Sequence, residues 1–201
     1  MRPTATLLLL ALVAWVAALA SAGAAAMGAF ATLPKIGISV AGTEAFFAGD
    51  TAEMGRHAAG RMLAPVFLLS DWVQIGASSL SVACTVRLAR LRGMRGAPWA
   101  RRILVACVAA AACLMAWRAW TAPGMNADLL AWWQAISDGA RAGADAARTS
   151  FDAAHRVADA LHRITLGAVL LGTAAFPAAL IPPAFMPPAF MPPAASRTPD
   201  A

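Results

Sequence analysis

A single carboxylate in the middle of an apolar stretch is the residue best placed to do chemistry. Asp71 is the tenth residue of a hydrophobic block that runs from about Met62 to Val86. An ionised acid near the centre of a membrane helix costs about 2.5–3.5 kcal/mol, so it should face the interior of a bundle and pair with a cation. Arg118 and Arg163 are the best available cations. We expect a structural clamp between helices, and the alternative is a proton or cation step on a transport pathway.

Two histidines suggest a second chemistry. His57 and His162 lie near the ends of two hydrophobic blocks that should face the same side of a bundle. Opposing histidines on two bundle helices can ligate a haem iron, although a histidine at a membrane interface is more often a polar anchor. His155 and His162 are two helical turns apart, about 10.5 Å, and cannot share one metal ion.

Acidic residues recur every seven positions in the segment from Ala127 to Arg163, and each is followed three residues later by an arginine or a histidine. The acids are Asp138, Asp145, Asp152 and Asp159, and the partners are Arg141, Arg148, His155 and His162. Seven residues make about two helical turns, so the acids form one stripe with their partners beside it. The pattern favours a solvated helix face. The alternative is a carboxylate relay along the stripe.

The sequence lacks the patterns of common enzyme and metal sites. Neither of the glycine-rich phosphate loops GxGxxG and GxxxxGK[ST] occurs, and no nucleophile–base arrangement stands out. Cys84, Cys107 and Cys113 fall inside apolar blocks without CxxC spacing, which is typical of small buried hydrophobic residues. We therefore predict a non-enzymatic protein with no metal site and no cofactor.

The elements that carry these residues are predicted to be membrane helices. Apolar residues make up 60% of the chain and charged residues 13%, against about 45–50% and 25% in soluble proteins. The apolar residues come in four blocks, at about 6–30, 62–86, 103–120 and 164–181. The sequence predicts an all-α, integral membrane four-helix bundle. Pro123-Gly124 should end the third span, with one amphipathic extramembrane helix over about 127–163.

The two ends of the chain raise separate questions. The first block can be an uncleaved membrane helix, which its length favours, or a signal peptide cleaved after Ala22. The segment 182–201 repeats Pro-Pro-Ala-Phe-Met, and proline at this density cannot hold a helix. We predict an extended, disordered tail that is dispensable for insertion. A partner that binds polyproline is the alternative role for the repeat.

Arginines predict the orientation. The connection between the second and third blocks holds six arginines and no acid: Arg87, Arg90, Arg92, Arg95, Arg101 and Arg102. Basic loops stay in the cytoplasm, so four spans place both termini inside and the segment 127–163 outside. The location of the arginines favours a membrane loop over nucleic-acid binding. We expect a multi-pass protein of a bacterial inner membrane.

Three short motifs resemble those of the transmembrane protein 205-like family, a bacterial domain of unknown function. Phe30-Ala31-Thr32-Leu33-Pro34 is similar to its Phe-x-x-Leu-Pro turn, and Ala59-Gly60-Arg61-Met62 to its Ala-Gly-rich stretch before the second helix. Leu161-His162-Arg163-Ile164-Thr165 is similar to its Leu-His-Arg-hydrophobic-Ser start of the last helix. The departures are Thr165 in place of serine and Val169 in place of asparagine.

This resemblance would cover about residues 6–176. It implies a four-helix membrane protein and makes His162, Arg163 and Thr165 candidate site residues. We predict a non-enzymatic inner-membrane protein with an accessory or stress-related role. The alternatives are a small transporter or channel subunit that uses Asp71, and a haem-binding membrane redox protein. The expected partners are the lipid bilayer and a second copy of the chain or another membrane protein, with no nucleic acid.

Overall fold

The computed structural model describes residues 2–181, and α-helices account for most of these residues. The helices are α1 (Arg2–Ile36), α2 (Glu44–Phe47), α3 (Thr51–Arg90), α4 (Pro98–Ser137) and α5 (Arg141–Leu180). The described residues contain no strand. The all-α prediction is therefore confirmed. The segment 182–201, for which we predicted disorder, lies outside the described residues.

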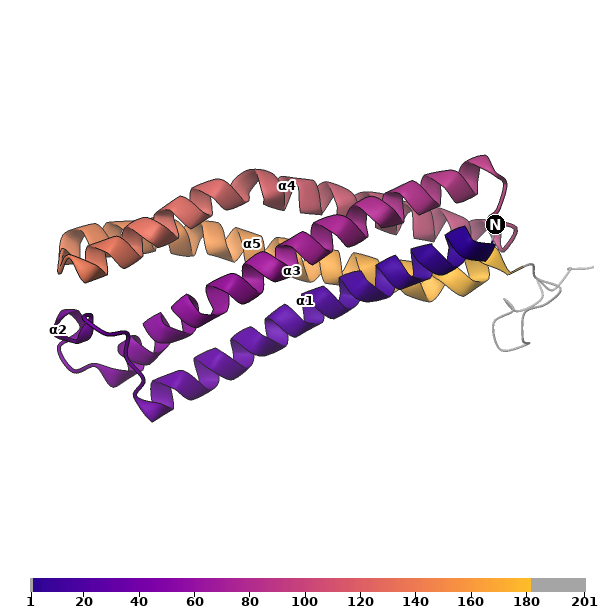
Figure 1. Cartoon of the computed structure of the whole chain (residues 1–201). Helices are drawn as coiled ribbons and strands as arrows, with labels where there is room; N and C mark the ends of the chain where they lie inside the picture. The colour runs from indigo at the N-terminus through magenta and orange to yellow at the C-terminus, as the bar shows by residue number, and fades with distance from the viewer. Residues whose placement is uncertain (1, 182–201) are drawn as a thin grey trace, which may run out of the picture.

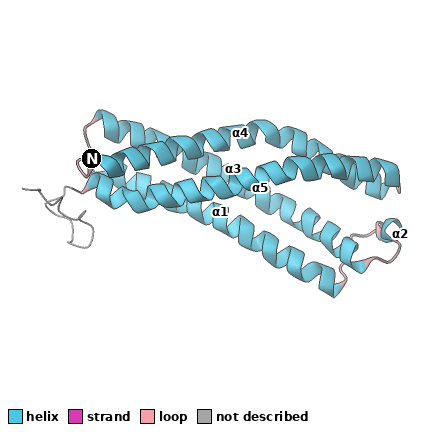
Figure 2. Ribbon diagram, turned by 180° about the vertical axis from the view of Figure 1, so that it is seen from behind, coloured by secondary structure: helices cyan, strands magenta, loops and turns pink. Residues whose placement is uncertain are grey.

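The four long helices form two antiparallel pairs, α1 with α3 and α4 with α5 (Figure 1). The connection 91–97 between α3 and α4 lies at the same end of the bundle as the N-terminus, and we call this the arginine end. The other end, called the far end, holds α2 and the turn 138–140. The two pairs lie close together at the arginine end and diverge toward the far end (Figures 1 and 2).

All four long helices are apolar enough to cross a membrane, as predicted for a multi-pass membrane protein. They are longer than a bilayer requires. At 1.5 Å per residue, helices of 35 and 40 residues extend about 53 and 60 Å, against a hydrocarbon core of about 30 Å. About half of each helix must therefore lie outside the hydrocarbon region.

The predicted end of the third helix is wrong. α4 passes through Pro123 and continues to Ser137. A proline removes one backbone hydrogen bond from a helix, and the packing of α4 along α5 offsets that loss. The single helix predicted for 127–163 is likewise two helices, separated by a turn at Gly139 with φ of 68°. Asp138 therefore caps α4 and does not belong to the stripe on α5.

The segment between the first two predicted blocks contains the first eleven residues of α3, about three helical turns. Asp50 caps this helix by accepting a hydrogen bond of 3.0 Å from the backbone N–H of Glu53. An acid at the cap with glutamate three residues later is the pattern of a capping box. Gly55 lets α3 approach the end of α1, because a Cβ at this position would lie 2.4 Å from Cα of Pro34.

A few apolar residues such as Leu63 and Ile136 are buried in the far half, but the main hydrophobic cluster lies in the half of the bundle nearer the arginine end. Its members from α1 are Leu8, Leu12, Trp15 and Leu19, all fully buried. The other helices contribute residues 77–88 of α3, 100–115 of α4 and 169–179 of α5. The charged residues of α5 all precede Ile164. We call the half with the main cluster the apolar half and the other the charged half, because the other half holds every acid that the structure describes except Asp71.

Candidate functional site

Asp71 of α3 forms an ion pair with Arg118 of α4. The carboxylate Oδ1 lies 2.7 Å from the guanidinium Nη2, although the two groups are not aligned as a hydrogen bond. The side chains are 30% and 15% exposed. Of the two cations proposed as partners of Asp71, Arg118 is the one in contact, and this contact joins the two helix pairs.

His162 of α5 extends this contact to the remaining helices. Its Nδ1 lies 3.2 Å from Nη1 of Arg118, and its Nε2 lies 3.1 Å from the carbonyl oxygen of Leu19 in α1. An arginine guanidinium can only donate, so Nδ1 accepts and Nε2–H donates to the carbonyl. The imidazole is therefore the neutral Nε2–H tautomer. We call Asp71, Arg118, His162 and the Leu19 carbonyl the central network.

Polar residues beside the central network tie α3 to α1. Ser70 donates to the carbonyl oxygen of Ala18 over 3.1 Å, and Gln74 Nε2 donates to Ser70 Oγ over 3.0 Å. Ser70, Gln74, Ser78 and Ser81 are all buried. This polar face of α3 thus meets protein.

All four members of the central network lie at the middle of their helices. The midpoints fall at residue 19 in α1, between 70 and 71 in α3, between 117 and 118 in α4, and between 160 and 161 in α5. Asp71 is the tenth residue of the predicted hydrophobic block but lies at the middle of α3, because α3 starts at Thr51 rather than at Met62. The network marks the boundary between the apolar half and the charged half.

The other candidate residues do not belong to this network. Arg163 is exposed and pairs with Asp159 over 2.6 Å, not with Asp71. It follows His162 directly, and consecutive helical side chains point about 100° apart. Thr165 is buried and donates to the carbonyl oxygen of Leu161 in its own helix. The hydrogen bond of its hydroxyl therefore lies within α5 and does not join α5 to another helix.

The acidic stripe on α5 takes part in ordinary surface ion pairs. Arg148 lies 3.7 Å from Asp152 and 3.5 Å from Glu53 of α3, and these side chains are 27–50% exposed. Both intrahelical pairs of the stripe join residues four positions apart, rather than the three that we predicted. Exposed pairs of this kind contribute about 0–1 kcal/mol. The stripe is a solvated face that also contacts α3.

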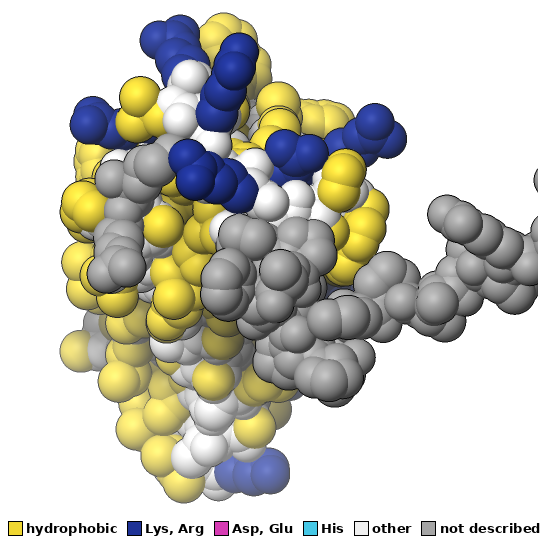
Figure 3. Space-filling model, turned by 90° about the vertical axis from the view of Figure 1, so that its right-hand side faces the viewer, with side chains coloured by type: hydrophobic (Ala, Val, Ile, Leu, Met, Phe, Trp, Pro, Cys, Tyr) yellow, Lys and Arg dark blue, Asp and Glu magenta, His cyan; other side chains and the backbone are white. Residues whose placement is uncertain are grey.

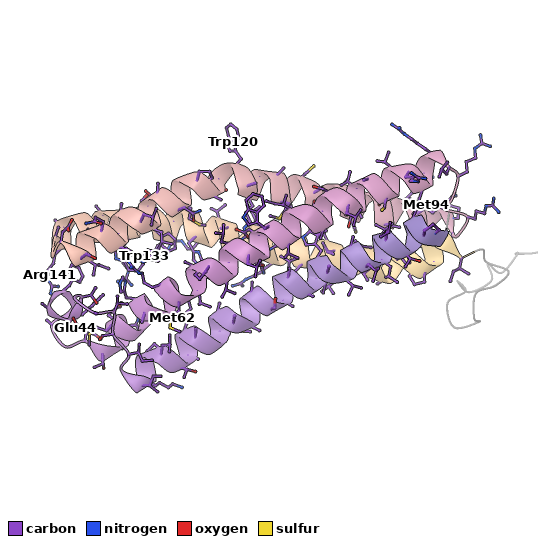
Figure 4. All side chains as sticks on the ribbon, viewed as in Figure 1. Glu44, Met62, Met94, Trp120, Trp133 and Arg141 are labelled. Atoms are coloured by element: carbon purple, nitrogen blue, oxygen red, sulfur yellow. The ribbon has the colours of Figure 1, made fainter. Side chains whose placement is uncertain are left out.

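His57 lies in an aromatic cluster near the far end. Its ring centroid is 5.6 Å from that of Phe47, 6.1 Å from Trp132 and 6.5 Å from Trp133. The residue is 2% exposed, and neither ring nitrogen bonds to a described protein group. Figure 4 shows Trp133 near this end with Glu44 and Arg141, far from Met94 at the arginine end.

The two histidines proposed as haem ligands are too far apart for one iron. His57 precedes Asp71 by fourteen residues of the same helix, a rise of about 21 Å, while His162 is joined to Asp71 through Arg118. Both nitrogens of His162 are also engaged by protein groups. The described residues contain no group of three histidine, cysteine or acidic side chains that could hold a metal ion.

Sequence reasoning missed two parts of this arrangement. The carbonyl groups of Ala18 and Leu19 accept side-chain hydrogen bonds, and a backbone acceptor has no residue type by which a sequence could reveal it. The cluster around His57 was also missed, because Trp132 and Trp133 were assigned to a helix separate from the third span. The two tryptophans reach His57 of α3 only because α4 continues past Pro123.

Comparison of the chain with protein-family models, curated proteins and solved structures found no match. The chemistry of the central network must therefore be judged from its geometry. It holds one acid, one arginine and one neutral histidine, joined across four helices. This arrangement can hold the helices together, and it could pass a proton only by breaking its own contacts.

Proposed function

We propose that the chain is a non-enzymatic, multi-pass protein of a bacterial inner membrane with an accessory or stress-related role. The observation that carries this proposal is the central network, in which Arg118 contacts both Asp71 and His162. Groups committed to one another in this way stabilise a helix arrangement rather than bind a substrate. The resemblance to the transmembrane protein 205-like family is in keeping with such a role and rests on the three motifs alone.

The distribution of charge supports a position in the bilayer. The half nearer the arginine end carries the hydrophobic core, and six arginines without an acid lie at its tip. We place this half in the hydrocarbon region, the arginine end in the cytoplasm and the charged half outside. Asp71 then lies sixteen residues from Arg87, and Arg118 sixteen residues from Arg102. Each separation is a rise of about 24 Å, which places the ion pair near the outer boundary of the hydrocarbon region.

The charged half would then form a platform outside the membrane. It carries the ion pair between Arg148 and Glu53 and the aromatic cluster around His57. Arg141 of α5 also donates to the carbonyl oxygen of Phe46 over 2.6 Å. Such a platform suits contact with another membrane protein or with a second copy of the chain.

A transporter or channel subunit is the second candidate. The incomplete burial of Asp71, 30% exposed, favours it, because a carboxylate on a pathway must be reached by water. Ion flux decides between the two candidates. The full-length protein would be reconstituted into liposomes with a pH-sensitive dye inside, and proton and sodium gradients would be imposed.

We expect the ion flux in proteoliposomes with the parent protein, and in those with Asp71→Asn, to be no greater than the background flux in empty liposomes. The asparagine variant keeps the shape of the side chain and removes its charge, so it serves as the matched control. Flux in the parent that Asp71→Asn abolishes would establish the transporter and refute the accessory role.

A further inference from the structure

A hollow of about 1000 Å³ opens at the arginine end, between the last turn of α3, the connection 91–97 and the first turns of α4. Four arginines line it: Arg92, Arg95, Arg101 and Arg102. None of them forms an ion pair with a residue that the structure describes, and the sequence has no acid between Asp71 and Asp128. On the face drawn in Figure 3, most Lys and Arg side chains gather toward one edge. The hollow is thus strongly cationic.

The connection around the hollow is fixed in place. Met94 is 7% exposed, and the backbone N–H groups of Gly96 and Ala97 donate to the carbonyl oxygens of Ala179 and Ala178 of α5 over 3.0 and 2.8 Å. Arg101 donates to the carbonyl oxygen of Met94 over 3.1 Å. The arginines therefore surround a preformed frame and not a flexible loop.

The wall of the hollow changes from cationic to apolar along α4. Val105 and Ala106 line it one turn beyond Arg101 and Arg102. Val105 is 41% exposed, and the neighbouring Trp99 is 47% exposed. A molecule with an anionic head and an apolar chain would match both parts of this wall, whereas a free anion would match only the first.

We propose that the hollow binds the phosphate headgroup of an anionic phospholipid, with its acyl chains along Val105 and Ala106. Arginine guanidinium groups bind phosphate oxygens in pairs of hydrogen bonds. Basic pockets at the cytoplasmic ends of membrane helices bind such headgroups. The site rests on the proposed position of the arginine end in the bilayer, but it does not depend on the role of Asp71.

Calorimetric titration of the full-length protein in a neutral detergent tests the site. Three probes are used at physiological ionic strength: a short-chain phosphatidylglycerol, phosphatidylcholine with the same chains, and inorganic phosphate. We expect saturable binding of phosphatidylglycerol only. Each arginine near an anionic lipid is worth about 1 kcal/mol, so Arg95→Gln with Arg102→Gln should weaken binding about 30-fold.

The matched control is Arg87→Gln with Arg90→Gln, which removes the same charge at the same end from residues that do not line the hollow. This control variant should weaken binding of phosphatidylglycerol less than about threefold, because salt screens the nonspecific attraction between exposed arginines and an anionic lipid. Equal losses in the two double variants, equal binding of phosphatidylcholine, or phosphate binding as tight as that of the lipid would each overturn the proposal. None of these outcomes bears on the flux experiment.

Discussion

His57 is buried and His162 is partly buried, and the two histidines differ in the groups that their ring nitrogens contact. His162 contacts Arg118 with one nitrogen and the carbonyl oxygen of Leu19 with the other. Neither nitrogen of His57 bonds to a described protein group. A buried polar group that has no hydrogen-bond partner lowers the free energy of unfolding by about 1–3 kcal/mol. A substitution that removes the partner of such a group has a cost of the same size. The two residues should therefore respond differently to an apolar ring of similar size.

We expect His162→Phe to lower the free energy of unfolding by about 1–3 kcal/mol, because it leaves the Leu19 carbonyl without its donor and removes one of the two contacts of Arg118. His57→Phe should leave stability unchanged or raise it, since phenylalanine suits the aromatic surroundings. Thermal unfolding of both variants in detergent measures the difference. A loss of stability in His57→Phe equal to that in His162→Phe would show that His57 has a polar partner.

At the level of residues, the sequence narrowed the partner of Asp71 to Arg118 or Arg163, but it could neither choose between them nor find the network. An acid deep in an apolar block requires a cation, and Arg118 is one of few. The choice between Arg118 and Arg163 depends on which face of α5 meets α4. The role of His162 depends on a backbone carbonyl of α1. Both follow only from the packed helices.

At the level of elements, the ends of the helices were harder to predict than the helices themselves. Pro123-Gly124 was expected to end a helix, yet α4 continues through it for fourteen residues after Pro123. The cost of an internal proline, about 3 kcal/mol, is local, whereas the packing of α4 on α5 extends over the whole pair. Hydropathy located the four spans, but it could not show that each helix continues into the charged half.

The connection 91–97 should be sensitive to a single methyl group. A Cβ at Gly96 would lie 2.0 Å from the carbonyl oxygen of Ala178, whereas one at Gly124 would meet nothing within 4 Å. We expect Gly96→Ala to lower the melting temperature, because the backbone must shift and two hydrogen bonds to α5 weaken. Gly124→Ala should leave it unchanged or raise it, since alanine favours a helix by about 1 kcal/mol.

Thermal unfolding in detergent compares the two glycine variants. Equal melting temperatures for Gly96→Ala and the parent would mean that the connection does not dock on α5 as described. The lipid site would then lose its preformed frame.

The whole molecule is about twice as long as the hydrocarbon core of a bilayer is thick, and its two halves differ in polarity. Trp120 lies just beyond the central network on α4 and is 86% exposed, pointing away from the bundle (Figure 4). Tryptophan is enriched at membrane–water interfaces. Its place agrees with an outer boundary of the bilayer near the network.

Topology follows from this placement. Reporter fusions at Arg95 should be active only as cytoplasmic reporters, and fusions at Gly139 only as periplasmic ones. The reason is that a loop with six arginines stays in the cytoplasm. Periplasmic activity at Arg95 would reverse the orientation, and N-terminal sequencing that begins after Ala22 would reduce the spans to three.

The central claim is that Asp71 and Arg118 clamp the two helix pairs together, and a double-mutant cycle tests it most directly. The free energy of unfolding in detergent would be measured for the parent, Asp71→Leu, Arg118→Leu and the double variant. Each single change strands a charge and should cost about 2–3 kcal/mol, less than for a fully buried pair because both groups are partly exposed. The double variant should cost at least about 1 kcal/mol less than the sum of the two. Additivity within about 0.5 kcal/mol, or an Asp71→Leu variant as stable as the parent, would contradict the clamp.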